Sequence, residues 1–392
     1  MSMSSPVHRF IQKSLILVCG FVVASLSAQV GVNQLDGNFK ALALSGDRLV
    51  AIDLSNDDSE ISTSDNDGAS FTSRYTSDDN YEALAAVGST VIAVGIDGLV
   101  LRSGDSGSTW NPADAPLLNG SLHSVAGRTD GANANKWIAV GDALFSGFVY
   151  RSIDDGQIWT EVEEINDLLI EDVIWTGTSW LLCGRDFFNE GSVYRSTDGL
   201  TWSASTVPFA TAPLLAMSSD GAGVVVAVGE QGQVLRSTDD GLTFTTVASG
   251  VFSGDLDAVI VDGSGIFYLG GDERTIIELD GASASFLIPP AASAAPVLDF
   301  VLIDDVPFAV GAAGVVQLRT IALDLLIATG GTRDFRLNVS QSLTGKTYFL
   351  QTSVDLVNWG LVPDTSTVGS GALLSFDVAE DELKRFWRVI EF

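Results

Sequence analysis

The sequence has little from which a disulfide, a metal site or a histidine-based catalytic centre could be built. Its 392 residues include two cysteines and two histidines. Cys19 lies in an amino-terminal apolar run, so Cys183 has no partner for an internal disulfide, and its apolar neighbours predict a buried, unreactive thiol. His8 and His123 are too few for a histidine triad or a histidine-rich metal site.

Basic residues are also scarce. The chain has 20 Lys and Arg against 50 Asp and Glu, which gives a formal net charge of −30. The field of such a surface repels nucleic acid and anionic membranes, and we expect neither as a partner. Because 46% of the residues are hydrophobic, the acidic residues are predicted to cover a folded body rather than to keep the chain disordered.

Long apolar runs are absent beyond the first 28 residues, which are predicted to be an export signal. Arg9 and Lys13 precede an apolar stretch at 15–26 that is too short to span a bilayer, and Ser27-Ala28 offers a small-residue cleavage site. No later segment reaches roughly 18 uninterrupted apolar residues, so we expect no membrane insertion. The prediction is an exported monomer that is periplasmic, on the cell surface or extracellular.

What the sequence does contain is a repeated motif of the form Ser-x-Asp-x-Gly-x-Thr-Trp, here called the box. The four clear copies consist of Ser103, Asp105, Gly107 and Trp110; Ser152, Asp154, Gly156 and Trp159; Ser196, Asp198, Gly199 and Trp202; and Ser237, Asp239, Gly241 and Phe244. With a worn copy around Gly68, the box glycines lie 39, 49, 43 and 42 residues apart. Recurrence at that period predicts one supersecondary unit repeated as a solenoid or propeller.

A second register of the repeat is a short apolar run closed by glycine, such as Val91–Gly95 or Val225–Gly229. Seven such runs occur, and their closing residues lie 41 to 46 residues apart. Short runs rich in Val and Ile and bounded by Gly, Asp and Ser predict strands, and four strands per copy predict an all-β, seven-bladed β-propeller. We expect residues 30–37 to pair with the strand near 315–319 and so to close the ring.

The repeat stops near Thr320, which divides the chain into three predicted parts. These are a signal peptide at 1–28, the propeller at 29–320 and a small antiparallel β-sandwich at 321–392. In the last part, strand-like runs such as 335–339 and 386–389 alternate with Gly and Asp turns.

The box resembles the Asp-box, or BNR repeat, of sialidases, sortilin-type receptors and xyloglucan-cleaving endoglucanases. The longer unit, an apolar run followed by Arg-Ser and the box, resembles the photosystem II stability and assembly factor propeller family over roughly residues 39 to 320. The tail segments at 350–359 and 385–388 resemble a short carboxy-terminal domain of large secreted bacterial proteins. These resemblances imply a propeller fold, and they include both enzymes and assembly factors.

The box aspartates are predicted to hold turns rather than to act in catalysis. Asp and Ser side chains bond nearby backbone amides, Gly takes the conformation that others avoid, and the aromatic residue packs beneath the hairpin. A sialidase would also need three clamping arginines and an early Arg-Ile-Pro segment, which this sequence does not contain. Arg102, Arg151, Arg195 and Arg236 instead occupy one repeated place beside the box serine, as structural residues would. This favours a non-enzymatic protein.

One set of carboxylates remains as a candidate binding face, because they follow the closing residue of five apolar runs. They are Asp97, Asp142, Asp186, Glu230 and Asp272. In a propeller this turn lies at the channel mouth, opposite the boxes, where a ring of carboxylates could bind calcium or a basic partner. The alternative is that acidic residues occur there as favoured turn formers.

These observations favour a secreted, non-enzymatic binding or assembly scaffold with an unidentified protein or glycan partner. No cofactor is expected, and calcium is the one metal ion considered. A carbohydrate-active hydrolase of the Asp-box type and a structural cell-surface protein are the alternatives. The acidic composition departs from the arginine-rich patch of the photosystem II factors, so the resemblance does not imply a shared partner.

Overall fold

The computed structural model describes residues 27–29, 38–53, 59–66, 68, 70–115, 120–128, 136–144, 146–247, 252–288, 294–303, 306–311, 314–317, 320–327, 333–339, 347–353, 360–361, 367–368, 374–378 and 386–391. Their regular structure is β-strand, with three single-turn 3-10 helices, η1 (Ile96–Gly98), η3 (Glu230–Gly232) and η4 (Asp272–Arg274). The chain forms two compact units. One is Gln34–Val316, and the other combines Met1–Asn33 with Gln317–Phe392.

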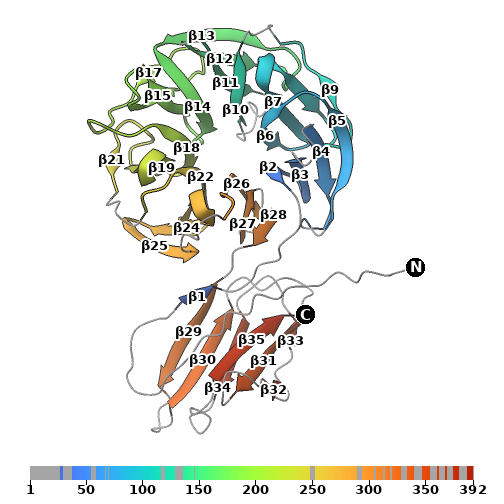
Figure 1. Cartoon of the computed structure of the whole chain (residues 1–392), viewed down its shortest axis with the longest axis vertical. Coiled ribbons are helices and arrows are strands. Elements are labelled where there is room, and N and C mark those ends of the chain that lie inside the picture. Colours follow the sequence, from blue (N-terminus) through green and yellow to red (C-terminus); the bar gives the residue numbers. More distant parts are fainter. Residues whose placement is uncertain are drawn as a thin grey trace. The chain divides into compact units, whose positions relative to one another are not determined.

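The unit Gln34–Val316 contains six four-stranded antiparallel sheets, each made of four consecutive strands (Figure 1). The first three are β2 to β5 (Phe39–Ser45, Arg48–Asp53, Ser59–Ser64, Thr72–Ser77), β6 to β9 (Tyr81–Val87, Thr90–Gly95, Val100–Ser103, Asn111–Pro112) and β10 to β13 (Ser121–Gly127, Trp137–Ala143, Ser146–Ser152, Thr160–Asn166). The next three are β14 to β17 (Leu168–Trp175, Trp180–Asp186, Gly191–Ser196, Ser203–Ala204), β18 to β21 (Leu214–Ser219, Val225–Gly229, Val234–Ser237, Thr245–Thr246) and β22 to β25 (Leu256–Val261, Phe267–Gly271, Ile276–Asp280, Ser283–Ile288). A three-stranded sheet follows, β26 to β28 (Asp299–Ile303, Val306–Gly311, Gly314–Gln317).

The sheets stand around a centre like the blades of a β-propeller, with the first strand of each sheet innermost (Figure 1). Each first strand contacts the first strand of the next sheet, and β26 contacts β2, so the contacts run round a complete circle. Where the circle closes, Phe39 and Leu42 pack with Phe308 in one apolar cluster. The backbone N–H of Leu42 also donates a hydrogen bond of 2.8 Å to the Asp299 carboxylate.

The second strands have continuous apolar central runs because neighbouring sheets cover both of their faces, and charged residues such as Arg48, Asp53 and Asp186 occur only at or next to strand ends. All six residues of β7 are buried, whereas the outer strand β5 has no buried residue. Continuous apolar runs are the pattern of strands buried on both faces. The buried second strands therefore form the core between sheets, and the outer strands carry the polar surface.

A bulge near the start of the first strand recurs in all six four-stranded sheets, and in five of them it explains the glycine that closes the second strand; in the first sheet Asp53 occupies that position. In β6 the bulge leaves Glu82 as the extra residue, and a Cβ atom on Gly95 opposite it would lie 2.0 Å from the Asn80 carbonyl oxygen. Only glycine fits there. The matching residues in other sheets are Gly141, Gly184, Gly229 and Gly271, where the corresponding distance is 1.9 to 2.0 Å. In the sixth sheet this residue is thus Gly271, one position later than the sequence pattern places it.

The other compact unit has two antiparallel sheets. The first has the order β1 (Ser27–Gln29), β29 (Thr320–Ile327), β30 (Arg333–Val339) and β34 (Leu374–Val378). In the second, β31 (Thr347–Ser353) pairs with β32 (Gly360–Leu361), β33 (Thr367–Val368) and β35 (Phe386–Glu391). The side chains of these strands lie outside the described part of the chain, so the sandwich at 321–392 stays a prediction.

The ends of the two units differ from the expected boundaries at 29 and 320, because β1 and β29 pair with each other. Ala28, the last residue of the expected signal peptide, pairs with Ile321. Residues 30–37 lie outside the described residues, as do 318–319. The pairing of 30–37 with 315–319 therefore stays a prediction.

Candidate functional site

The boxes lie in the turns between the third and fourth strands, where their side chains bond one another. In the second sheet, Asp105 Oδ1 accepts hydrogen bonds from Ser103 Oγ at 2.7 Å and from the Thr109 N–H at 2.8 Å. The Gly107 N–H donates to Ser103 Oγ at 2.9 Å, and Trp110 Nε1 donates to the Gly107 carbonyl at 3.0 Å. The hydrogen bonds from the Thr109 side chain and backbone lower the pKa of Asp105 to about 2.

The other clear boxes repeat this arrangement. The serine hydroxyls of Ser152, Ser196 and Ser237 donate to Asp154, Asp198 and Asp239 at 2.7 to 3.0 Å, and accept from the N–H groups of Gly156, Gly199 and Gly241 at 2.8 to 3.0 Å. Trp159 and Phe244 are buried, and Trp202 packs against an apolar cluster. Backbone hydrogen bonds to Asp198, and the Thr243 hydroxyl bonded to Asp239, lower both pKa values to about 2. The box carboxylates are thus ionised and saturated with local donors.

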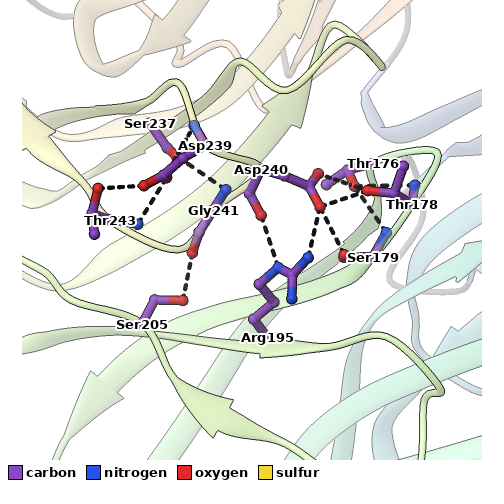
Figure 2. Close-up of polar contacts among 10 residues, drawn as sticks. All are labelled: Thr176, Thr178, Ser179, Arg195, Ser205, Ser237, Asp239, Asp240, Gly241 and Thr243. Atoms are coloured by element: carbon purple, nitrogen blue, oxygen red, sulfur yellow. Dashed lines mark hydrogen bonds and ion pairs between the residues drawn. The ribbon is translucent and has the colours of Figure 1, made fainter.

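In two boxes the residue after the box aspartate is a second aspartate, which joins its sheet to the preceding one. Asp240 accepts hydrogen bonds from the hydroxyls of Thr176 at 2.5 Å, Thr178 at 2.6 Å and Ser179 at 2.7 Å, and from Arg195 Nη2 at 2.9 Å (Figure 2). All four donors belong to the sheet β14 to β17, whereas Asp240 belongs to the next sheet. Burial raises the pKa of Asp240, but these hydrogen bonds outweigh it and the pKa is lowered.

Asp155 makes the same joint between the second and third sheets. It accepts from Thr90 Oγ1 at 2.7 Å and from Arg102 Nη2 at 2.5 Å. The neighbouring Gly156 has φ +79°, and a Cβ atom on it would lie 2.4 Å from Ile92 Cδ1 of the preceding sheet. The boxes therefore hold the ring together. Sequence reasoning found their local turns but missed this second role, although the Asp-Asp pairs and the repeated arginines signal it.

The opposite ends of the sheets carry the turns between the second and third strands and the starts of the first strands, because neighbouring strands are antiparallel. We call this side the mouth face. The predicted carboxylates follow the closing glycine here, but at two different positions. Asp142, Glu230 and Asp272 come directly after it, and Asp97 and Asp186 come one residue later. Each position thus holds carboxylates in only some of the sheets.

A further set of side chains at the mouth face comes from the bulges of the first strands. The bulge residues, in order round the ring, are Lys40, Glu82, His123, Glu171, Leu215 and Asp257. Five of the six are ionisable. Sequence reasoning missed this set because its members share no residue type, yet a closing glycine marks the place in five of the six sheets.

Pairwise contacts join several bulge residues to turn residues or to one another, and the ionisable residues at this face are together called the mouth network. Lys40 is ion-paired with Glu82. His123 Nε2 lies 3.0 Å from Asp142 Oδ2, which joins a bulge to a turn of the same sheet. Between the fourth and fifth sheets, Arg185 Nη1 lies 3.8 Å from Glu230 Oε1.

The balance of this network is acidic. Burial raises the pKa of Asp257 to about 6, helped by the charges of Asp272 and Asp255. Burial also raises the pKa of Glu171, against the opposing charge of His123. Burial alone would lower the pKa of His123, but the hydrogen bond and charge of Asp142 and the charge of Glu171 raise it overall.

Metal binding and thiol chemistry find little support in the described part of the chain. No group of three or more His, Cys, Asp or Glu side chains among those residues is placed to hold a metal ion. Cys183 is fully buried, and burial raises its thiol pKa, which confirms the expected inert thiol. No helix within the described residues is long and apolar enough to cross a membrane.

Comparison with known proteins shows the fold and leaves the activity open. No family model matches the sequence, and no curated protein matches it. Among solved structures, the chain is similar to YCF48 from Cyanidioschyzon merolae (13% identity, 74% of this chain and 98% of that chain, TM-score 0.56). It is also similar to a streptogramin B lyase (12%, 76% and 98%, TM-score 0.58) and to a GH74 enzyme from Niastella koreensis (14%, 85% and 66%, TM-score 0.54). At these identities the likeness shows a β-propeller and selects no activity.

Proposed function

We propose that this chain is an exported, non-catalytic β-propeller that serves as a binding or assembly scaffold, and that its mouth face binds a cation or a basic segment of a partner. The observation that carries the proposal is the network of ionisable bulge and turn residues at the mouth face. The boxes, by contrast, use their polar groups within the ring and leave few for a ligand.

The charge balance of the mouth face explains why a positive ligand would bind there. Asp257 and Glu171 have raised pKa values, which means that both carboxyl groups are penalised for ionising where they stand. A bound cation or a lysine side chain would remove part of that penalty and would be attracted by the net charge of −30. Binding and ionisation of these groups would therefore support each other.

The proposal also covers four features of the chain's architecture: the seventh blade, the signal peptide, the carboxy-terminal sandwich and the type of box. We infer that β26 to β28 form a seventh blade, which the contact of β26 with β2 and the Leu42–Asp299 hydrogen bond support, and that residues 30–37 supply its outer strand. We also infer that residues 1–28 are a signal peptide, that 321–392 form a β-sandwich, and that the boxes are Asp-boxes like those of the photosystem II factor propellers. The assignment of the boxes is supported by the serine-to-aspartate hydrogen bond that the boxes of this chain have in common.

Calorimetric titration with calcium chloride and with a short oligolysine peptide tests the proposal. The mouth variant is Asp97→Asn, Asp142→Asn and Asp186→Asn. The control variant Asp47→Asn, Glu161→Gln and Asp280→Asn removes three exposed carboxylates outside the mouth face. We expect wild type and control to bind oligolysine or calcium alike, and the mouth variant to bind about tenfold more weakly at low salt. Equal binding by all three proteins, or none, would contradict the proposal.

A carbohydrate-active hydrolase is the second candidate, and one observation favours it. A general acid for glycoside cleavage needs a raised pKa and a second carboxylate nearby, and Asp257, with Asp255 and Asp272 close by, has the raised pKa. Hydrolysis of chromogenic glycosides by wild type, and its loss in Asp257→Asn, would establish this alternative. The scaffold proposal predicts no turnover by either protein.

A further inference from the structure

Four large apolar side chains stand exposed on one part of the mouth face. Leu144 is 89% exposed, Phe187 67%, Phe188 83% and Phe209 94%. Here they are called the apolar arc. The other exposed large apolar residues within the described segments, such as Ile153 and Leu242, lie in the boxes on the opposite side and are 42% to 57% exposed. Several large apolar side chains exposed together on one face mark an interaction site more often than single exposed residues do.

Three of these residues lie in two hairpins that are longer than the corresponding hairpins of three other sheets. In the second, fifth and sixth sheets the second strand stops at its closing glycine and enters a 3-10 turn. In the third sheet the pairing of β11 with β12 continues to Ala143 and Ser146, and in the fourth sheet β15 and β16 pair as far as Arg185 and Gly191. Leu144, Phe187 and Phe188 lie in the turns of these two hairpins. Phe209 lies in the connection from β17 to β18, at the same end of the sheets.

Backbone hydrogen bonds connect the segments that carry the four residues, from the third sheet to the start of the fifth. Beside Leu144, Ser146 pairs with Asn166, and the carbonyl of the next residue, Asp167, accepts the Phe187 N–H at 3.1 Å. At the other side of that hairpin, the Gly191 N–H donates to the Thr211 carbonyl at 2.8 Å, two residues after Phe209.

Carboxylates border the arc directly. Asp142 and Asp186 lie two residues before Leu144 and Phe188, and Glu190 follows in the same hairpin. Asp142 Oδ2 lies 3.0 Å from His123 Nε2, and Asp186 Oδ1 accepts the N–H groups of Phe188 and Glu190, which leaves one oxygen of Asp186 and the Glu190 carboxylate to face a ligand. The neighbouring Arg185 does not neutralise these carboxylates, because its Nη1 lies 3.8 Å from Glu230 Oε1 and pairs with that carboxylate instead. A ligand for this surface must therefore offer apolar side chains with positive charge next to them. A second copy of this chain, with its net charge of −30, does not offer that, and neither does an anionic membrane.

We propose that the apolar arc and its bordering carboxylates form a docking surface for an extended basic segment of another protein, in which aromatic or aliphatic side chains alternate with lysine or arginine. The inference deepens the proposed binding function and rests on it. The carboxylates steer and orient the segment, and the apolar side chains supply the contact area that holds it. The affinity for a peptide should therefore fall as the salt concentration rises, and it should independently increase with the number of apolar side chains in the peptide.

Two synthetic peptides of equal length and charge separate these contributions. One alternates lysine with glycine, and the other alternates lysine with leucine and phenylalanine. The arc variant is Leu144→Ser with Phe188→Ser, and the matched control is Ile153→Ser with Leu242→Ser. All four residues are exposed, so both variants should fold. Affinities are measured by fluorescence anisotropy, together with binding to vesicles of zwitterionic lipid.

We expect wild type and control to bind the apolar lysine peptide about tenfold more tightly than the glycine peptide, and the arc variant to lose that difference while still binding the glycine peptide. If the glycine peptide binds but apolar residues add nothing in wild type, the docking surface is refuted and the acidic mouth survives. If neither peptide binds, the docking surface is refuted, and the proposed binding of a basic segment at the mouth face fails with it. Vesicle binding that the arc variant loses would reassign the arc to membrane contact and so overturn the inference.

Discussion

The two faces of the ring use the same kinds of residue in opposite ways. On the box face, Asp105 and Asp239 are surrounded by donors that hold their pKa values at about 2. At the mouth face, Asp257 lies partly buried beside other carboxylates, and its pKa rises to about 6. Aspartate alone thus says little about role. The donors within reach decide whether it holds the fold or remains available to a ligand.

The largest expected difference between the faces is in stability. Trp110→Ala removes a buried aromatic ring from a box and should lower the free energy of unfolding by about 3–5 kcal/mol. Leu144→Ala, an exposed residue at the mouth, should change it by no more than about 0.5 kcal/mol. Denaturant melts of both variants provide the comparison. Normal melting of Trp110→Ala would place the box tryptophan outside the core.

The second largest loss of stability is expected at the hydrogen-bonded contacts between neighbouring sheets. Asp240→Ala leaves Arg195 and three hydroxyl groups without their shared acceptor and should cost about 2 kcal/mol. Asp280→Ala, an exposed carboxylate at the end of β24, serves as the control. A double-mutant cycle with Arg195→Ala should show a coupling of about 1 kcal/mol. Strict additivity would mean that the joint adds nothing to stability.

The carboxylates of the mouth face should affect how the free energy of unfolding depends on pH. Since Asp257 binds its proton more tightly in the folded chain, with a pKa of about 6 against 3.8 unfolded, its contribution favours folding below about pH 4. That contribution is lost as pH rises to about 6. Asp257→Asn should remove the loss and be about 1 kcal/mol more stable than wild type at pH 8, after allowance for partial exposure. Identical pH profiles of the two proteins would contradict the burial argument.

The smallest expected change in stability belongs to the turn carboxylates. Asp97 is exposed with φ 55°, a conformation that asparagine also tolerates, so Asp97→Asn should alter the melting point by less than about 2 °C. Asp97→Val should cost more, because β-branched residues are strained there. If Asn and Val destabilise equally, the turn needs the carboxylate charge itself.

The sequence predicted what repeats and missed what varies. The box at Ser103–Trp110 and the run at Val91–Gly95 recur with the same residue types, so the turns and the buried strands could be found from period alone. The bulge residues, from Lys40 to Asp257, share only their position in the strand register, and no common residue type marks that position in the sequence. The glycine opposite five of the six bulges was visible, but its meaning depends on a carbonyl oxygen of the neighbouring strand that would lie about 2 Å from an added Cβ atom, which no single strand reveals.

The apolar arc could not be predicted for a different reason. Phe187 and Phe188 are a lone apolar pair between Asp186 and Asn189 that belongs to no repeated pattern, and only the hairpin between β15 and β16 shows that they are exposed. Asp155 and Asp240 contact arginines of the preceding sheet. Predicting these contacts would require knowing how far one sheet is rotated from the next. These are tertiary facts, and a repeat period carries no information about them.

Hydrogen–deuterium exchange with and without the lysine-leucine-phenylalanine peptide tests most directly the claim that the mouth face binds and the box face holds the fold. The account predicts that the peptide slows exchange in the segments 140–147, 185–191 and 208–212, and leaves the box segments 103–110 and 152–159 unchanged. Protection confined to the box segments, or no protection anywhere at saturating peptide, would contradict it.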